Sequence, residues 1–436
     1  GCVATAVAIL MRYYEWPDVG TGTLPAYSYT VNINGREISQ TVPERTLGNT
    51  YAWNNMPLEY DWNSSEVTEN EVATLMYDCG VMAQAEFNIA SAGGTGAATL
   101  TAVRGLAEYM KYDKSMLCLR REWYSDTEWI QMLENEIMTV GPVLYGGATL
   151  SNEGHQFILD GYTTENYFRV NWGWSGHSNG FFLISALNPD DQGAGGSTGG
   201  GFIANQDALF GLKPAKGNSN YQTLLGMLAG KTGSGESYSG LITSETQFNV
   251  NTNFTVKCGF FWNLGLIPFS GKVALAIVDK NQNVRELISG TSSIPSMNTY
   301  GGMAFTFPCK ISLSPQPGDR IVAVYKGTND ADWKIVRGGP DTTNEIIVKT
   351  DPTPIIETEQ ETRFTVHCDK QQGTVIAHLP ENSHTLNVYD VNGCLLRQIL
   401  SEGKDTIIFS CREYPAGVYI LQVITDKGSQ QCKFLK

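Results

Sequence analysis

The chain opens with the stretch GCVATAVAILMRYYEWP, residues 1–17, which places a single cysteine immediately before an apolar run. Apolar side chains recur at spacings of three and four from Val3 to Tyr14, and this period predicts a helix with one buried face. The dipeptide Trp16-Pro17 predicts the end of that helix, because the residue before a proline avoids the α region. Cys2 should therefore lie in the first turn or just ahead of it.

The position expected for Cys2 suggests a chemical role. The first turn of a helix presents unpaired N–H groups and the positive end of the helix dipole, and both stabilise an anion. A thiol held there ionises more readily and becomes a better nucleophile. The competing interpretation is an inert cysteine that packs as a small hydrophobic residue.

Length and composition exclude several classes of protein. The 436 residues contain no apolar run of membrane-spanning length, so an integral membrane protein is not expected. The net charge of -14 argues against nucleic acid and against an anionic membrane as partners. The nine cysteines form no closely spaced pairs and the five histidines do not cluster with them, so we expect no metal site and no cofactor.

The order of the predicted elements divides the chain into three parts. Residues 1–216 combine helical patterns, such as SSEVTENEVATLMYDCGV and TLTAVRGLAEYMKY, with the later strand-like runs GPVLYGG, HQFILDGYTTE, YFRVNWGW and NGFFLISAL, which indicates an α+β domain. Residues 221–350 show regularly spaced short strands typical of an antiparallel β-sandwich, immunoglobulin-like in pattern. After the proline- and acid-rich linker TDPTPIIETEQET, residues 362–436 form a smaller strand-only unit, in which Asn392-Gly393 predicts a hairpin.

A cysteine nucleophile needs a base that takes its proton and a third group that orients the base. The first part of the chain offers His155, at the start of a strand-like run, and His177, in a Gly/Ser loop; we favour His155 because the sheet would hold it. Asn171 reaches the same end of the sheet if the two runs pair as a hairpin through YTTENY, and its side-chain carbonyl could fix the histidine tautomer. Trp172 could shield that bond from water. Taken singly, His155 is better interpreted as a structural histidine and Asn171 as a turn residue, and only their joint placement with Cys2 favours the catalytic interpretation.

Three of these stretches resemble one family. GCVATAVAILMRYY, GHQFILDGY and VNWGWSGHSNGFFLISALNP are similar, in order and spacing, to the signature blocks of the streptopain family of secreted bacterial cysteine peptidases. The resemblance covers roughly Gly1 to Pro214 and implies a papain-like fold that hydrolyses protein or peptide substrates through an acyl-enzyme, with Cys2 and His155 as a thiolate–imidazolium pair. It also implies an orienting Asn171, a neighbouring Trp172, and substrate contacts from Ser91, Ala92, Gly93 and Gly154.

Two departures from the family pattern follow from the same resemblance. The family places an oxyanion-stabilising glutamine upstream of the nucleophile, so we expect the precursor to carry a pro-segment and the upstream part of the catalytic domain ahead of Gly1. Some family members carry a glutamine near the cleft where this chain has Gly146.

The last part of the chain resembles a second family. VYDVNGCLL, YPAGVYILQV and the final CKFLK are similar to the C-terminal sorting domains of type IX secretion cargo, which implies a secreted or cell-surface protein of a Gram-negative, Bacteroidetes-like bacterium. The middle domain is interpreted either as a module that binds a host or surface protein or as a spacer. Two other functions stay open: a cysteine acyltransferase of transglutaminase type, and a surface adhesin whose peptidase domain is vestigial.

Overall fold

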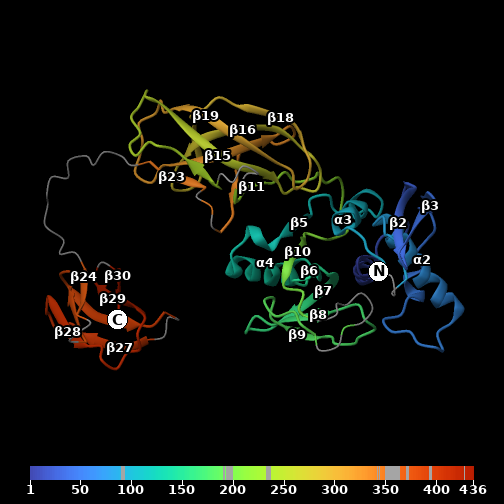
Figure 1. Ribbon diagram of the computed structural model, residues 1–436, viewed down its shortest axis with the longest axis horizontal. Coiled ribbons are helices and arrows are strands. Elements are labelled where there is room, and N and C mark those ends of the chain that lie inside the picture. Colours follow the sequence, from blue (N-terminus) through green and yellow to red (C-terminus); the bar gives the residue numbers. More distant parts are fainter. Residues whose placement is uncertain are drawn as a thin grey trace. The chain divides into compact units, whose positions relative to one another are not determined.

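The computed structural model describes residues 1–89, 94–189, 192, 200–231, 237–340, 342, 344–348, 364–369, 373–391, 395–426 and 428–436. The chain divides into two compact units, Gly1–Thr350 and Asp351–Lys436 (Figure 1). Within the described residues, no helix is both long and apolar enough to cross a lipid bilayer. The mixed α/β part of the first unit positions the site discussed below.

The opening stretch forms helix α1 (Cys2–Tyr14), as its apolar period predicts. Val7, Leu10 and Met11 are almost completely buried, and they pack against neighbouring helices and the central sheet. The helix ends at Glu15, whose φ of 47° is left-handed, directly before Trp16-Pro17. Its N-cap is Gly1, so no side chain caps the first turn.

The other α-helices begin at polar residues or next to them. They are α2 (Glu66–Met82), α3 (Thr99–Glu108) and α4 (Asp126–Thr139), and short 3-10 turns lie at η1 (Trp53–Asn55) and η3 (Arg121–Trp123). Ser65 caps α2 by accepting a hydrogen bond of 3.2 Å from the N–H of Thr68, the arrangement expected of a serine at this position. Ser125 caps α4 in the same way, at 3.3 Å from the N–H of Glu128.

A six-stranded antiparallel sheet forms the centre of the α/β part. In spatial order its strands are β5 (Leu117–Arg120), β10 (Ala204–Phe210), β6 (Val143–Ala148), β7 (Gly154–Tyr162), β8 (Phe168–Asn171) and β9 (Gly180–Phe182). The four predicted strand runs correspond to β6 to β9. The hairpin expected between β7 and β8 is confirmed, with Ile158 opposite Asn171. Strands β5 and β10 and helix α4 were not predicted from the sequence.

The central sheet separates two hydrophobic cores, because successive side chains of a strand point to opposite faces. Leu144, Ile158 and Leu209 share a core with α1, α2 and α3. Their sequence neighbours Val143, Leu159 and Ala208 lie in the other core, which contains Trp129 of α4 and a group of aromatic rings. A side chain on β7 therefore faces either the helices or the aromatic core, according to its position in the strand.

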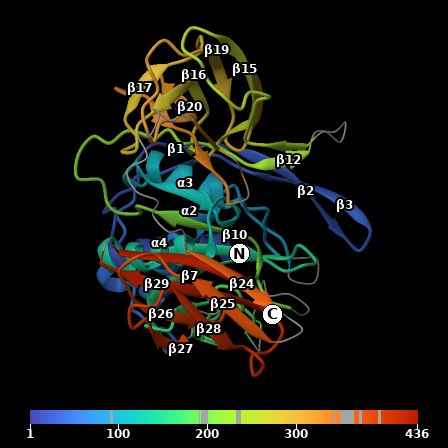
Figure 2. The ribbon, with the colours of Figure 1, turned by 90° about the vertical axis from the view of Figure 1, so that its left-hand side faces the viewer.

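Further strands precede α2. Strand β1 (Thr23–Leu24) pairs with β4 (Arg45–Thr46), and β2 (Tyr27–Ile33) pairs with β3 (Arg36–Val42). Figure 2 shows β2 and β3 as one long hairpin. The hydroxyl groups of Tyr27 and Tyr29 donate to the carbonyls of Ala85 and Phe87, which ties β2 to the segment after α2.

The remainder of the first unit is built from strands alone. One sheet contains β14 (Leu241–Ile242), β15 (Asn253–Asn263), β11 (Leu225–Met227), β22 (Arg337–Gly338) and β19 (Gly302–Lys310). The other contains β17 (Val284–Leu287), β16 (Phe269–Val278), β20 (Arg320–Gly327), β21 (Lys334–Ile335), β18 (Ser292–Met297) and β23 (Glu345–Ile347). Strands β12 (Ala229–Lys231) and β13 (Ser237–Ser239) form a separate pair. One core, which includes Phe261 and Leu275, holds both sheets together.

The α/β part and these sheets share an interface within the first unit. Leu264 is buried in the aromatic core of the α/β part. Arg337 donates to the carbonyl of Trp123 at 3.1 Å and to the carboxylate of Glu128 at 2.6 Å. Its guanidinium also lies 3.8 Å from the ring centroid of Tyr124. The interface thus contains both a buried apolar side chain and charged hydrogen bonds. We expect these contacts to stabilise the α/β part and the strand-only part against unfolding.

The second unit consists of two sheets around one core. One has the order β24 (Thr365–Asp369), β25 (Thr374–His378), β28 (Thr406–Ser410), and the other β27 (Leu395–Leu400), β26 (Ser383–Tyr389), β29 (Val418–Thr425), β30 (Gly428–Leu435). Strands β26 and β27 pair antiparallel, as the predicted hairpin requires. The Asn392-Gly393 turn itself lies outside the described residues.

Removing the Leu264 side chain should destabilise the first unit as a whole. Leu264 is 2% exposed and Leu287 is 36% exposed. We expect Leu264→Ala to lower the free energy of unfolding by about 2–5 kcal/mol, because it leaves a cavity in the shared core. The matched control Leu287→Ala should change it by at most about 0.5 kcal/mol. Equal effects of the two variants in urea unfolding would show that the interface contributes nothing to stability.

Candidate active site

Cys2 lies at the start of α1 on the wall of a cavity of about 1350 Å³. Its side chain is partly exposed, whereas most of the helix behind it is buried. The N–H of Thr5 donates to the carbonyl of Gly1 at 3.0 Å. The N–H groups of Cys2 and Val3 precede this bond, and such groups have no partner within their own helix. They can therefore stabilise negative charge beside the thiol.

His155 lies on the same cavity and is held by β7. Its side chain belongs to the face of the sheet that carries the aromatic core and is 4% exposed. The ring stacks on Trp174 with centroids 4.7 Å apart and on Phe157 with centroids 5.9 Å apart. Phe202 closes a further side, with a centroid distance of 5.3 Å. The imidazole is thus fixed in one orientation by packed rings.

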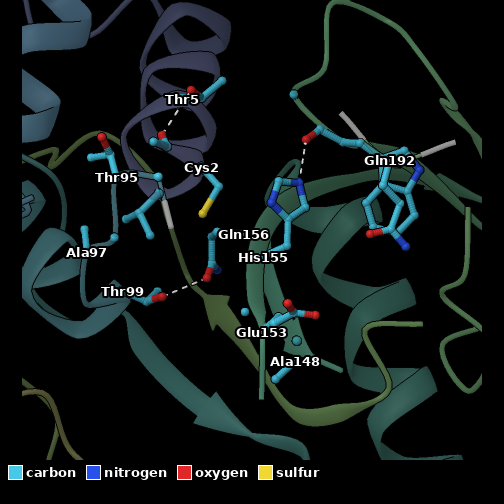
Figure 3. A pocket seen from close by; sticks show the side chains of 18 of the residues that line it. Cys2, Thr5, Thr95, Ala97, Thr99, Ala148, Glu153, His155, Gln156 and Gln192 are labelled. Atoms are coloured by element: carbon cyan, nitrogen blue, oxygen red, sulfur yellow. Dashed lines mark hydrogen bonds between the residues drawn. The ribbon is translucent and has the colours of Figure 1, made fainter. Parts of the chain in front are cut away.

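The two ring nitrogens of His155 have different surroundings. Nε2 lies 2.9 Å from the backbone carbonyl of Trp172. A carbonyl only accepts hydrogen bonds, so Nε2 must carry the proton in the neutral ring, and Nδ1 keeps its lone pair. Nδ1 is buried and has no hydrogen-bond partner among the residues that the structure describes. In Figure 3 the ring and the Cys2 sulfur face each other across the cavity, so Nδ1 is the nitrogen available to take the thiol proton.

Burial also sets the charge of the imidazole. It lowers the pKa of His155 from 6.5 to about 4, and the hydrogen bond to the Trp172 carbonyl offsets only part of this effect. The resting ring is therefore neutral near pH 7, which is the form that accepts a proton. An imidazolium becomes favourable when a thiolate forms beside it, because opposite charges at short range stabilise each other.

Asn171 and Trp172 lie at the end of β8. Asn171 Oδ1 accepts a hydrogen bond of 3.0 Å from the N–H of Gly173, so its side chain shapes the turn that presents the Trp172 carbonyl. That carbonyl occupies the place at the imidazole for which the sequence suggested the Asn171 side chain. Trp172 is fully buried and stacks on His155 with centroids 6.2 Å apart. The roles proposed for both residues in catalysis stay predictions.

The remaining predicted residues have different outcomes. Gly154 lines the cavity at the start of β7, and a Cβ there would meet only the Gly147 carbonyl, at 3.9 Å. Ser91, Ala92 and Gly93 lie outside the described residues. His177 also lines the cavity, with an exposed side chain, as expected for a histidine in a loop.

Several cavity residues were not predicted from the sequence. Trp174 contacts the imidazole more closely than Trp172 does, and the WGW repeat was a signal for it. Thr99 and Gln156 are linked by a hydrogen bond of 2.7 Å from the hydroxyl to the amide oxygen (Figure 3). Asp207 on β10 lines the same cavity. Neither β10 nor its register was predicted, so nothing in the sequence pointed to Asp207.

Four buried cysteines of the first unit are poor candidates for a second nucleophile. Burial raises the pKa of Cys79, Cys118 and Cys258, and it raises the pKa of Cys309 to about 11, so these thiols are poor nucleophiles. Across the part of the chain that the structure describes, no group of three or more His, Cys, Asp or Glu side chains could hold a metal ion.

Acidification should weaken the folded state through His155. Its pKa is about 4 in the folded chain and 6.5 when exposed, so the unfolded chain takes up the proton first. This contribution is complete above about pH 6.5 and is lost as the pH falls toward 4. Between pH 7 and pH 4.5 the free energy of unfolding should fall by about 2–3 kcal/mol more in wild type than in His155→Gln. Equal losses in urea unfolding of both proteins would contradict the burial argument.

Comparison with known proteins finds relatives of the N-terminal part of the chain, which contains this cavity. Residues 1–182 match the model of the Peptidase C10 family. The chain is 34% identical over 218 residues to streptopain of Streptococcus pyogenes serotype M28, which covers 49% of this chain and 52% of streptopain. It is 34% identical over 215 residues to the thiol protease/hemagglutinin PrtT of Porphyromonas gingivalis, covering 49% of this chain and 24% of PrtT.

A solved structure, the active wild-type interpain A cysteine protease of Prevotella intermedia, is 32% identical with a TM-score of 0.40, and the match covers 48% of this chain and 82% of that one. The chain spans about half the length of streptopain and a quarter of PrtT. Cys2, His155 and Trp172 all fall within the matched residues. Residues 1–182 thus match the Peptidase C10 family model, and about half of the chain is similar to streptopain and PrtT.

Proposed function

We propose that the chain is a cysteine endopeptidase that cleaves peptide bonds through an acyl-enzyme formed on Cys2. One observation carries this proposal: an unpartnered, buried Nδ1 of His155 shares one cavity with a thiol at the start of a helix. A nucleophile, a base and nearby backbone donors are the three parts that acyl transfer requires. The homology of residues 1–182 to thiol proteases supports the same reaction.

The reaction proceeds in two halves. In the first, the Cys2 thiol proton passes to Nδ1 of His155 and the sulfur attacks the scissile carbonyl, while the first N–H groups of α1 stabilise the oxyanion. The imidazolium then gives the proton to the leaving amine, and a thioester remains on Cys2. In the second half, Nδ1 of His155 takes a proton from water as the water oxygen attacks the thioester carbonyl. The C–S bond then breaks, the peptide acid leaves, and the imidazolium returns the proton to the Cys2 thiolate.

Trp172 and Asn171 are positioning residues in this proposal. The Trp172 carbonyl keeps the proton on Nε2 of His155, and the indole covers one side of the ring. Asn171 holds the turn that presents this carbonyl through its bond to Gly173. Substrate backbone contacts are assigned to Gly154 and, by resemblance, to Ser91, Ala92 and Gly93. The open space around Gly154 supports this role, because a substrate backbone could approach it closely.

The comparisons favour the peptidase over the two competing functions. A transglutaminase-type acyltransferase would use the same Cys2 and His155 but would transfer the acyl group to an amine in preference to water. A vestigial peptidase domain on an adhesin would lack a competent base, whereas His155 has its Nδ1 available.

The proposal also covers the domain boundaries and the destination of the protein in the cell. The papain-like domain is assigned to residues 1–216, an immunoglobulin-like sandwich to 221–350, and a sorting domain of type IX secretion type to 362–436. Two packed sheets in each of the last two regions support a sandwich architecture. We infer export to the surface or the medium of a Bacteroidetes-like bacterium, with a host or surface protein as partner of the β regions.

Substitutions at the cavity should separate the two histidines. Cys2→Ala and His155→Ala should each reduce kcat/KM on a denatured protein substrate by at least about a thousandfold, because nucleophile and base act as one unit. The matched variant His177→Ala should stay within about threefold of wild type, since that side chain is exposed. Asn171→Ala should fall between these limits, because it acts only through the Trp172 carbonyl.

The same assay discriminates the alternatives. Hydrolysis should exceed transfer to an added primary amine in the wild type, and the reverse result would favour the acyltransferase. Activity retained by Cys2→Ala within tenfold of wild type would overturn the proposal, as would equal losses in His155→Ala and His177→Ala.

A further inference from the structure

A row of four residues crosses the central sheet on the face that carries α1. Gln156 of β7 lies opposite Gly146 of β6, Gly146 lies opposite Asp207 of β10, and Asp207 lies opposite Arg120 of β5. Residues directly opposite one another in antiparallel strands present their side chains on the same face. The row therefore forms a polar strip beside Cys2, and both Gln156 and Asp207 line the cavity.

Gly146 leaves the middle of this strip open. A Cβ at Gly146 would lie 2.5 Å from Gln156 Oε1 and 2.8 Å from Asp207 Oδ1, closer than side chains tolerate. The glycine thus allows the amide and the carboxylate to approach each other across β6. Gln156 Nε2 donates to Asp207 Oδ1 at 3.5 Å, while Gln156 Oε1 accepts from Thr99 at 2.7 Å. The 3.5 Å bond is long, so Asp207 is only weakly satisfied.

Asp207 has no ion-pair partner among the described residues, although an arginine lies opposite it. The Arg120 guanidinium lies 3.9 Å from the ring centroid of Tyr300, and its Nη1 lies 3.6 Å from Glu122. The Tyr300 hydroxyl in turn donates to the Cys118 carbonyl at 3.0 Å. The β-sandwich thus supplies a partner for Arg120 through Tyr300 and leaves the Asp207 carboxylate facing the cavity.

A smaller cavity of about 650 Å³ also reaches Asp207, and Arg120 and Arg121 line it. Arg121 is engaged as well: it donates to Gln206 at 2.6 Å and to Asp126 at 2.7 Å. Neither arginine therefore neutralises Asp207 in the structure. A half-buried carboxylate without a counter-ion is costly, and a cation brought by a ligand would remove that cost.

We propose that Asp207, with Gln156 and Thr99, selects a lysine or arginine side chain of the substrate at one position near the scissile bond. This proposal rests on the proposed peptidase function and deepens it. The described residues that line the larger cavity include the carboxylates of Asp207 and Glu153 but neither lysine nor arginine. Thr99, Gln156 and Asp207 line the same cavity as Cys2, so a basic side chain bound in that cavity can donate to the Asp207 carboxylate.

The preference for a basic substrate side chain should increase with pH. Burial raises the pKa of Asp207 to about 6, and the Gln156 hydrogen bond and Arg120 oppose that rise. The titratable and charged groups nearest Asp207 are Arg120, Cys118 and Tyr300, together with Tyr145, whose side chain lies on the opposite face of β6. Burial raises the pKa of the thiol and of the two phenol groups. They keep their protons between pH 5 and 7, so Asp207 ionises in this range and the preference for a basic side chain should grow with pH.

Peptide sets tested on the full chain check this assignment. Each set places arginine, its uncharged isostere citrulline, or leucine at one of the three positions on either side of a common scissile bond. At one position, kcat/KM for arginine should exceed that for citrulline by about tenfold or more at pH 7, and the ratio should shrink at pH 5. Asp207→Asn should abolish the ratio with little change for citrulline, and Glu153→Gln should keep it.

The outcomes separate this inference from the proposed function. A ratio near one at every position, or an unchanged ratio in Asp207→Asn, overturns the selection while peptide turnover leaves the peptidase standing. Loss of the ratio in Glu153→Gln alone assigns it to the other carboxylate and also overturns the proposal. If wild type cleaves no peptide, the peptidase function fails. In that case the affinities of the same peptides for Cys2→Ala test the selection by Asp207. Tighter binding of the arginine peptide that is lost when Asp207→Asn is added supports the selection, and equal affinities for arginine and citrulline overturn it.

Discussion

The hydrogen bond between Nε2 of His155 and the carbonyl of Trp172, at 2.9 Å, is the contact on which the site depends. It fixes the tautomer, because a carbonyl can only accept, and it leaves the lone pair of Nδ1 for the Cys2 thiol. The aromatic rings around the imidazole hold this orientation and exclude water, which also keeps the resting ring neutral. The remainder of the domain serves to bring α1 to this nitrogen.

Successive side chains of β7 point to opposite faces of the central sheet, and residues of both kinds line the cavity. His155 and Gln156 are neighbours in β7, yet one side chain joins the aromatic core and the other faces the helices. The base is therefore held in an apolar environment, while a polar strip that ends at Asp207 lies one residue away. The strand-only part of the first unit contributes indirectly, because the Arg120 guanidinium lies 3.9 Å from the ring centroid of its Tyr300.

Short sequence patterns predicted the elements whose structure depends on residues that are close together in the chain. The apolar period of α1, the Ser65 cap and the β7–β8 hairpin were all predictable from short stretches, and Cys2 and His155 stood out within them. The position of Asp207 was not, because it depends on the pairing of β10 with β5 and β6 across long sequence separations. The acceptor at the imidazole was missed for a different reason: sequence reasoning searches side chains, and here a backbone carbonyl fills the role.

If Nδ1 of His155 activates Cys2, the rate at which the Cys2 thiol is alkylated depends on this histidine. Iodoacetamide is added to wild type, to His155→Gln and to His177→Gln at pH 6, and modification of Cys2 is followed by peptide mass spectrometry. We expect His155→Gln to slow alkylation of Cys2 by about tenfold or more, whereas His177→Gln should leave the rate near that of wild type. Equal rates in wild type and His155→Gln would show that His155 does not activate Cys2.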